Sequence, residues 1–522
     1  MKYISQPILL IHKPIMCHKR ERGGNPLYGV NYLNTISFEK TFSSLRTLTE
    51  DFSKNIHFKG LKEHLKQFRQ SHFEWPSLKI GNLTARTPII QGGMGVGISL
   101  SGLASAVAEA GGIGIIAANA IGMIEKDYYK DGQAANLRAL RKEIRKARKK
   151  TDGVLGVNIM VAVNDFHELM DVSIEEKIDL IVMGAGLPIK NLPVEKMRKN
   201  NVKAVPIVSS VRATELIFRM WEKIYNDVPD AVVFEGPLAG GHIGFSEEQI
   251  SDPDFQVEAI VPGIVEALKP FEEEFGRSIP VIAGGGVFTG EDIHNVFQLG
   301  ASGVQMGTRF VATDECDADE KFKQTYVDCT PEQIGIIKSP VGMPGRAIRN
   351  EYILASEAGE RPSFKCAWKC LSSCKAQDAN YCISIALNNA RRGKVNQGFV
   401  FAGANAHRVT EIVPVASLVG ELSEGYQLKA KESVVRNLDK LVARVQDLKH
   451  QYEGLAARVR DMGIADEKEL AARILEARDS GVDSLRRKYE SMSEKLGTLQ
   501  HQITDGLTAS WNLLKREAIF SR

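Results

Sequence analysis

The sequence of 522 residues has no long uninterrupted apolar run, little excess charge and few cysteines. A membrane-spanning helix needs about 18 consecutive apolar residues, whereas the apolar stretches between residues 88 and 122 are broken repeatedly by Gly, Gln and Asn. Lys and Arg number 67 against 64 Asp and Glu, so the net charge does not demand an acidic polymer as partner. The composition therefore predicts neither a membrane protein nor a nucleic-acid-binding protein.

The seven cysteines are an odd number and mostly lie late in the chain. They do not form the pattern of a disulfide framework in a secreted protein. Near the N-terminus, the apolar run Ile8–Ile11 is too short for the hydrophobic core of a signal peptide. We therefore expect a cytoplasmic protein.

Composition divides the chain into an N-terminal extension (1–72), a glycine-rich middle (73–421) and a charged, glycine-poor tail (426–522). In the tail, apolar residues recur at alternating steps of four and three over 434–462 and again over 485–503. This spacing predicts helices with a heptad seam. The seam would pack the two helices on each other, dock them on the rest of the protein, or join copies into a homo-oligomer.

The middle region contains eight short apolar runs, each followed by a stretch with helical periodicity. The runs begin at Pro88, Ile113, Val154, Asp179, Lys203, Asp230, Ile279 and Ser302. Strands that alternate eight times with helices are typical of a TIM (β/α)8 barrel, with a doubly wound open sheet as the alternative. We predict the α/β barrel, in which functional groups gather at the C-terminal ends of the strands.

The string FEGPLAGGHIGF, residues 234–245, follows the sixth predicted strand. Gly240 and Gly241 allow the backbone to pass close to a bound planar or anionic group. They also place His242 at the mouth of the barrel. A histidine on such a glycine-rich strand end is a candidate for catalysis or substrate contact.

Two further glycine strings follow the seventh and eighth predicted strands. IAGGGVFTG carries Gly285 and Gly286, and GVQMGTRF carries Gln305, Met306, Gly307 and Thr308. In TIM barrels the corresponding loops present backbone N–H groups to a phosphate, and glycines are needed because side chains would block its approach. The pair of strings therefore predicts a ligand that carries a phosphate.

The first predicted strand runs into QGGMGVG, which contains Gly92, Gly93 and Met94, and the third ends at Asn158. The backbone donors of Gly93 and Met94 and the amide of Asn158 are placed to bind the polar edge of a heterocycle across the barrel mouth. A flavin fits this arrangement.

The strings PIIQGGMGVG, GVNIM, AGGHIG, PVIAGGGV and GASGVQMGTRF resemble the nitronate monooxygenase family over residues 75–415. Flavin-dependent enoyl-acyl-carrier-protein reductases share these strings, so the resemblance is more specific for the barrel and FMN than for the reaction. It implies an FMN phosphate held by Gly285, Gly286, Gly307 and Thr308. It also implies an isoalloxazine near Gly93, Met94 and Asn158, with His242 as the catalytic residue.

The resemblance leaves three hypotheses for function. In the first, the enzyme oxidises alkyl nitronates with O2 to carbonyl compounds and nitrite. His242 would then act as a base on a neutral nitroalkane, because the ordinary histidine pKa of about 6.5 lies near working pH. In the second, NAD(P)H reduces the FMN, which reduces an enoyl thioester. In the third, the protein is a flavin-binding scaffold that acts through its helical tail.

Two charged segments bear on the substrate. The helix predicted over 138–150 holds eight basic residues and would attract an acidic carrier protein, unless it is an ordinary solvated helix of the barrel. Residues 339–350 form either a loop over the site, with Arg346 or Arg349 meeting an anion, or a structural loop.

Four of the cysteines fall close together, at Cys366, Cys370, Cys374 and Cys382. Four thiolates can hold Zn²⁺ or an iron–sulfur cluster, although this spacing matches no standard motif. The alternative is a set of free thiols that pack as small apolar side chains.

Overall fold

The computed structural model describes residues 75–360, 364–366, 368–372 and 374–461, together with 487 and 491. Contacts divide the chain into two compact units, His72–Ser433 on the one hand and Met1–Ser71 with Val434–Arg522 on the other. The predicted extension over 1–72 lies outside the described residues. None of the described helices is long and apolar enough to cross a membrane.

Eight parallel strands form a barrel in the order β3-β11-β10-β8-β7-β6-β5-β4. They are β3 (Ile89–Gln91), β4 (Gly114–Ala117), β5 (Leu155–Met160), β6 (Leu180–Gly184), β7 (Lys203–Val208), β8 (Val232–Glu235), β10 (Val281–Gly284) and β11 (Gly303–Met306). The first and last strands of this order meet where the Gln91 N–H donates to the Ile113 carbonyl at 3.0 Å. All eight predicted strands are present, and the predicted TIM barrel is confirmed.

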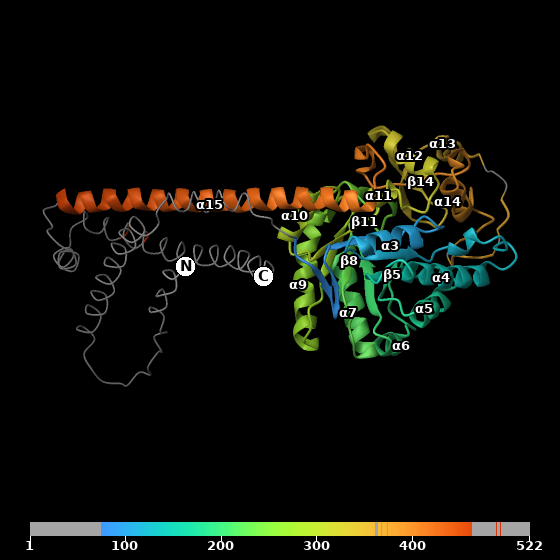
Figure 1. Ribbon diagram of the computed structural model, residues 1–522. Helices are drawn as coiled ribbons and strands as arrows, with labels where there is room; N and C mark the ends of the chain where they lie inside the picture. Colours follow the sequence, from blue (N-terminus) through green and yellow to red (C-terminus); the bar gives the residue numbers. More distant parts are fainter. Residues whose placement is uncertain are drawn as a thin grey trace. The chain divides into compact units, whose positions relative to one another are not determined.

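Helices alternate with the strands and surround them (Figure 1). They are α3 (Ser101–Glu109), α4 (Gly132–Arg148), α5 (Phe166–Glu175), α6 (Val194–Lys199), α7 (Val211–Tyr225), α8 (Glu247–Ile250), α9 (Val257–Phe275), α10 (Gly290–Gln298) and α11 (Thr308–Val311). Helix α7 shows why such segments are helical. The Ser210 hydroxyl accepts from the Ala213 N–H and caps its first turn, and Ile217, Phe218 and Trp221 form its buried face.

An apolar core fills the barrel interior, and a short hairpin packs against it. The hairpin consists of β1 (Leu78–Ile80) and β2 (Leu83–Ala85), which pair antiparallel. Leu78, Ile80 and Ala85 belong to the same buried cluster as Val182 and Val233 of the barrel strands. Because this hairpin precedes β3 and packs on the interior of the barrel, the opposite ends of the strands remain for a ligand.

Residues 312–414 form a layer that adds to the barrel where the strands end. This layer contains α12 (Glu320–Asp328), β12 (Ile334–Lys338), β13 (Pro344–Ile348), α13 (Glu351–Glu357), α14 (Ile383–Arg391) and β14 (Val400–Phe401). Strand β13 pairs with β12, with β14 and with the short β9 (Gly241–His242) that follows the sixth barrel strand. The pairing of Gly345 with His242 joins the layer to the predicted catalytic loop.

The last described helix, α15 (Val415–Asp461), contains 47 residues (Figure 1). Its first turns pack on the barrel, where the Tyr426 ring lies 5.7 Å from that of Phe297 and 6.1 Å from that of Trp75. The predicted helical tail is therefore present over the first seam as far as Asp461. The second predicted seam, over 485–503, lies outside the described residues except at 487 and 491.

Candidate active site

A cavity of about 410 Å³ lies at the C-terminal ends of the barrel strands. This is the end at which TIM-barrel enzymes place their active sites. All the predicted cofactor residues line it, at Gly92, Gly93, Met94, Asn158, Gly240, Gly241, Gly285, Gly286, Gln305, Met306, Gly307 and Thr308. His242 lines it as well, so the structure brings the predicted site residues together around one cavity.

The glycines after β10 and β11 leave space at the cavity wall. Gly285 and Gly286 have φ angles of +84° and +105°, a conformation that favours glycine. A Cβ atom built on Gly307 would have no atom within 4 Å, so this position faces open space. Gly307 also precedes α11, whose first N–H groups have no acceptor within the helix. These loops form a concave wall lined by backbone.

A further loop, residues 402–405, completes this wall and was not predicted from the sequence. The Gly403 N–H donates to the Thr308 hydroxyl at 3.1 Å, and the Asn405 amide donates to the Gly286 carbonyl at 2.7 Å. A Cβ on Gly240 would lie 2.5 Å from the backbone of Ala402 and Gly403, so the loops pack backbone to backbone. The only sequence signal for this loop is the short string AGAN, which resembles an ordinary turn.

The loop after β3 packs tightly on the end of β5. A Cβ on Gly93 would lie 2.4 Å from the Asn158 Cβ, so only glycine allows this approach. The Gly92 N–H donates to the Met306 carbonyl at 2.8 Å, and the Met94 N–H donates to the Ser99 hydroxyl at 3.1 Å. These bonds hold the loop across the barrel mouth.

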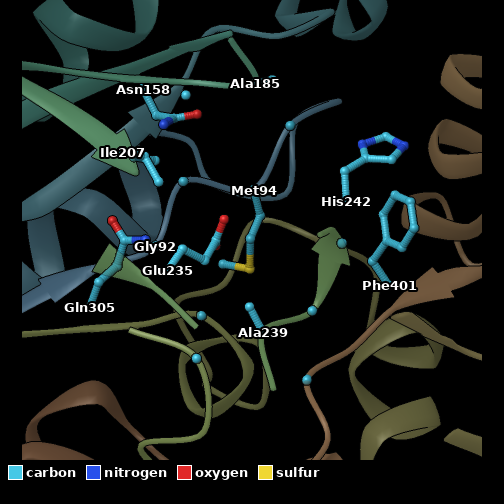
Figure 2. Close-up of a pocket in the computed structure, with 18 of the residues that line it drawn as sticks. Gly92, Met94, Asn158, Ala185, Ile207, Glu235, Ala239, His242, Gln305 and Phe401 are labelled. Atoms are coloured by element: carbon cyan, nitrogen blue, oxygen red, sulfur yellow. The ribbon is translucent and has the colours of Figure 1, made fainter. Parts of the chain in front are cut away.

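His242 lies at one side of the cavity, next to Phe401 (Figure 2). The two rings are 5.1 Å apart and meet edge to face. The His242 Nε2 lies 2.7 Å from the hydroxyl of Ser339, a residue of the loop between β12 and β13. Burial lowers the pKa of His242 to about 4, so its imidazole is neutral at physiological pH.

Glu235 ends β8 and is the one carboxylic acid among the described residues that line the cavity. In the sheet register, Gly284 lies between Glu235 and Gln305, so the two polar side chains flank a position without a side chain. Figure 2 shows both on the side of the cavity away from His242. Burial raises the pKa of Glu235 to about 7, well above that of an exposed carboxyl. Glu235 was not predicted as a site residue from the sequence.

The two arginines proposed for an anion have different surroundings. The buried Arg346 donates to the carbonyls of Pro237 and Ala239 at 2.6 and 2.7 Å, and so holds the loop that leads to His242. Desolvation lowers its pKa to about 10. Arg349 instead forms an ion pair with Glu357. The predicted loop over 339–350 contains strand β13, which carries Arg346, and neither arginine lines the cavity, although Met343 just before this strand does.

The cysteine-rich segment does not assemble the predicted metal site. The described residues include Cys366, Cys370, Cys374 and Cys382, and among them no group of three or more metal-ligating side chains is suitably placed. All four are free thiols. Burial raises the pKa of Cys370 to about 11, which disfavours the thiolate that would bind a metal. Leu371 of this segment instead lines the cavity.

The basic surface of α4 is largely neutralised within the protein. Six of its basic residues form ion pairs with nearby carboxylates, namely Arg138, Arg141, Lys142, Arg145, Lys146 and Arg148. Glu176 accepts from both Arg141 and Arg145, and these bonds lower its pKa. The structure therefore favours an ordinary solvated helix of the barrel over a docking surface for an acidic carrier.

Comparison with known proteins gives the same fold and a family. "Probable nitronate monooxygenase" of Staphylococcus saprophyticus is 27% identical over 301 residues, which cover 52% of this chain and 78% of that protein. A Mycobacterium tuberculosis protein, "(3aS,4S,5R,7aS)-5-hydroxy-7a-methyl-1-oxo-octahydro-1H-indene-4-carboxyl-CoA dehydrogenase", is 27% identical over 274 residues, 52% of this chain and 66% of its own.

Among solved structures, FabK from Thermotoga maritima is similar with a TM-score of 0.50 and 27% identity, over 66% of this chain and 94% of FabK. A nitroalkane oxidase from Streptomyces ansochromogenes shares the fold with a TM-score of 0.51 at 22% identity, over 66% of this chain and 97% of its own. The family model for nitronate monooxygenase matches residues 77–425, which include every loop of the cavity. The chain therefore belongs to the nitronate monooxygenase family of FMN-dependent oxidoreductases.

Proposed function

We propose that this enzyme oxidises alkyl nitronates with O2 to carbonyl compounds and nitrite. The observation that carries the proposal is the neutral, hydrogen-bonded His242 beside a backbone-lined wall in one cavity. A histidine with a lowered pKa is a poor base for removing a carbon-bound proton. It is well suited to a substrate that arrives already deprotonated, as a nitronate does.

The cavity residues fit FMN. The open space at Gly307 leaves room for a phosphate that a side chain would block, and Gly285, Gly286 and Thr308 adjoin it. Gly92, Gly93, Met94 and Asn158 would hold the isoalloxazine, with Gln305 and Met306 on the neighbouring strand β11 and Gly240 and Gly241 beside His242. Bound there, FMN supplies the electron acceptor for the substrate and the group that reacts with O2.

Ser339 would set the proton position on His242. The Ser339 oxygen lies 3.4 Å from the Val341 N–H, from which it accepts, so its hydroxyl proton is available for the His242 Nε2. With the serine as donor, the ring proton would reside on Nδ1, the nitrogen that does not contact Ser339. An Nδ1–H group can donate to an anionic oxygen of the nitronate and hold its carbon near the flavin.

The overall reaction balances without another reductant. Two nitronates and one O2 give two carbonyl compounds and two nitrites, and each substrate carbon exchanges its bond to nitrogen for a bond to oxygen. NAD(P)H has no place in this scheme. It belongs to the second candidate, reduction of an enoyl thioester, which the similarity to FabK over 94% of that chain favours.

One anaerobic experiment separates the two candidates. The purified protein, loaded with FMN, is mixed with propyl nitronate or with NAD(P)H while the flavin absorbance is followed. We expect prompt loss of absorbance with propyl nitronate and, once air is admitted, production of nitrite. Reduction by NAD(P)H with no response to nitronate would replace the proposal with the reductase. Failure to bind FMN at all would contradict both.

A His242→Gln variant links that result to the site. Gln retains a hydrogen-bonding side chain without the imidazole, so FMN should still bind while nitronate oxidation falls about 100-fold or more. The matched control is His167→Gln on α5, away from the cavity lining, which should leave the rate unchanged. Unaltered turnover in the His242 variant would remove this residue from the mechanism.

A further inference from the structure

The cavity extends beyond the backbone-lined wall into an apolar wall built by the layer over 312–414. Seven large apolar or aromatic side chains of that layer line it, namely Phe322, Tyr326, Met343, Leu371, Ile383, Leu387 and Phe401. No Lys, Arg or Asp lines any part of the cavity among the described residues. A cavity wall of this composition binds hydrocarbon and offers a charged group no partner.

The polar atoms of this wall are engaged elsewhere. The Tyr326 hydroxyl donates to the backbone carbonyl of Phe401, so the ring and not the oxygen is left for a ligand. Ser384 lies with its hydroxyl 3.8 Å from the Cys370 thiol. Ile383 and Leu387 are four residues apart on α14, so the same helical face presents both to the cavity.

The wall is built into the fold. Residues 370–372 are tied to the loop after β5, because the Asn164 N–H donates to the Cys370 carbonyl and the Ser372 N–H donates to the Ala162 carbonyl, both at 3.0 Å. Leu371 forms a β-bridge with Val163 between these two bonds. Leu387 packs against the buried cluster that contains Phe322 and Tyr326. A preformed apolar surface binds a chain without the cost of ordering its own side chains.

We propose that Leu371, Ile383 and Leu387 bind the alkyl chain of the substrate and make this enzyme selective for nitronates with medium-length, unbranched hydrocarbon chains. This inference rests on the proposed function, since it names the substrate class of the same site. The nitronate head lies at His242 and the chain extends along the wall that α14 and the cysteine-rich segment supply. A chain with a terminal charge is rejected, because the wall has no group to pair with it.

The test is a series of primary alkyl nitronates from ethyl to octyl, with nitrite production as the readout. Each methylene buried on the wall should raise kcat/KM about three- to four-fold until the chain outgrows the cavity. A nitronate of similar length that ends in a carboxylate should fall to the level of ethyl nitronate or below.

Two variants of Leu387 test whether this wall causes the dependence of kcat/KM on chain length. In Leu387→Asn the gain in kcat/KM per methylene should shrink to less than two-fold, because the polar amide no longer favours hydrocarbon. In Leu387→Trp the added bulk should shorten the longest chain accepted, a result that does not depend on tolerating a polar group. Leu354→Asn is the matched control, because Leu354 lies on α13 of the same layer but is 51% exposed and does not line the cavity. It should keep the full chain-length dependence.

A binding measurement separates this inference from the proposed function. Unreactive n-alkanols from ethanol to octanol are titrated against the FMN-loaded protein, and the shift of the flavin spectrum gives the dissociation constant. If longer alkanols bind more tightly and Leu387→Asn loses this trend, the alkyl-binding wall is supported even when no nitronate is oxidised. The absence of nitronate oxidation would refute the proposed function alone. If ethyl nitronate is oxidised but rates and alkanol affinities differ less than two-fold along both series, the inference is wrong and the proposed function stands.

Discussion

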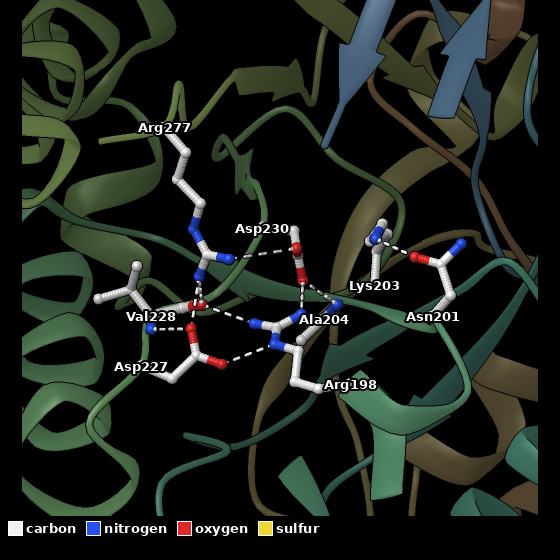
Figure 3. A network of polar contacts seen from close by, with 8 residues as sticks. All are labelled: Arg198, Asn201, Lys203, Ala204, Asp227, Val228, Asp230 and Arg277. Carbon is white, nitrogen blue, oxygen red and sulfur yellow. Dashed lines mark hydrogen bonds and ion pairs between the residues drawn. The ribbon is translucent and has the colours of Figure 1, made fainter. Parts of the chain in front are cut away.

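Charged side chains are paired at one end of the barrel, whereas the titratable side chains of the cavity at the other end have no charged partner among the described residues. Where β7 and β8 begin, Arg198 and Arg277 form ion pairs with Asp227 and Asp230 (Figure 3). Although burial disfavours its charge, hydrogen bonds from Arg198 hold the pKa of Asp227 below its usual value. Where β8 ends, Glu235 has no such partner, and burial alone sets its raised pKa.

The charged residues at the start of β7 and β8 therefore contribute to stability, whereas those at the end of β8 and beyond belong to the candidate site. Paired charges satisfy each other and tie the connections at one end of the barrel, as when the Asp230 carboxylate accepts from both Arg198 and the Ala204 N–H. At the other end, Glu235 and His242 are desolvated without an opposite charge, which shifts both pKa values toward the neutral forms. Shifted, unpaired groups around a cavity are typical of a functional site.

Removing a paired charge should give the largest effect. Asp230 is only 5% exposed, so Asp230→Ala leaves Arg198 and Arg277 short of a partner inside the protein. We expect a loss of about 3–5 kcal/mol in the free energy of unfolding, measured with urea. The fraction that remains folded should bind FMN and turn over normally.

The control for this variant is Asp254→Ala, at an exposed position with no ion pair to lose. It should change stability by less than about 0.5 kcal/mol. Equal stability of the two variants would show that the network in Figure 3 contributes little.

Adding a methyl group at Gly307, at the cavity end of the barrel, should weaken FMN binding with little effect on the fold. The Cβ of Gly307→Ala would meet no protein atom within 4 Å, and the φ of −104° is allowed for alanine. It would occupy the space that we assign to the FMN phosphate. We expect FMN to bind roughly 10- to 100-fold more weakly, as overpacking by 1–3 kcal/mol implies, measured by fluorescence titration.

Gly420→Ala provides the comparison, since its Cβ also meets nothing within 4 Å but lies on the exposed face of α15. Its FMN affinity should equal that of the native protein. Native affinity in Gly307→Ala as well would place the phosphate elsewhere.

Ser339→Ala should change how His242 titrates. Without the hydroxyl that bonds Nε2, the neutral ring loses a partner, so the pKa of His242 should rise slightly while burial still holds it below its ordinary value. A bond of this kind is worth about 1 kcal/mol, so KM for nitronate should rise roughly five-fold with a smaller change in kcat. The pKa is measured by NMR of the His242 ring protons.

Ser339→Thr keeps a hydroxyl at the same position and should restore both the pKa and KM. If the alanine variant lowers activity while the His242 titration stays native, Ser339 serves only the packing of its loop.

Glu235→Gln should give the smallest effect, visible only as a function of pH. In the native protein Glu235 becomes anionic as pH rises through about 7 and would repel an anionic nitronate by about 1 kcal/mol, or roughly five-fold in KM. Gln remains neutral, so its KM should stay level between pH 6 and about 8.5.

The same residue links pH to stability. The pKa of Glu235 is about 7 in the folded protein and 4.5 for the same group outside the buried site. The folded state therefore holds the proton more tightly, and the protein loses stability as pH rises between these two values. Glu235→Gln should remove that part of the pH dependence of the melting temperature. An unchanged profile would mean that Glu235 is ionised throughout.

Several features of the site could be read from local sequence. Glycine-rich strand ends such as those at Gly93 and Gly285 are needed wherever backbone approaches backbone or a ligand closely, and the structure shows both close approaches. His242 was predicted because it comes immediately after such a string, at Gly240 and Gly241. The periodicity of apolar runs was sufficient to locate every barrel strand, because parallel strands buried on both faces are nearly continuous in apolar residues.

Other features had no local signal. Ser339 is 97 residues from His242 in the sequence, and only the pairing of β9 with β13 brings them within 2.7 Å. The cysteine spacing was compatible with a metal site, but coordination depends on where the sulfur atoms point, and the fold directs Leu371 of that segment to the cavity instead. The basic run in α4 likewise gave no sign of the carboxylates that α5 supplies to it.

The sequence by itself determined the barrel, the end of the barrel that carries the cavity and the glycines that line it. These properties depend on residues close together in the chain, whose backbone freedom and apolar periodicity act locally. The tertiary structure alone decided the charge state of His242 and Glu235, the partner of the histidine and the apolar wall of the cavity. Each of these depends on desolvation and contact by segments far apart in sequence, which only the packed fold brings together.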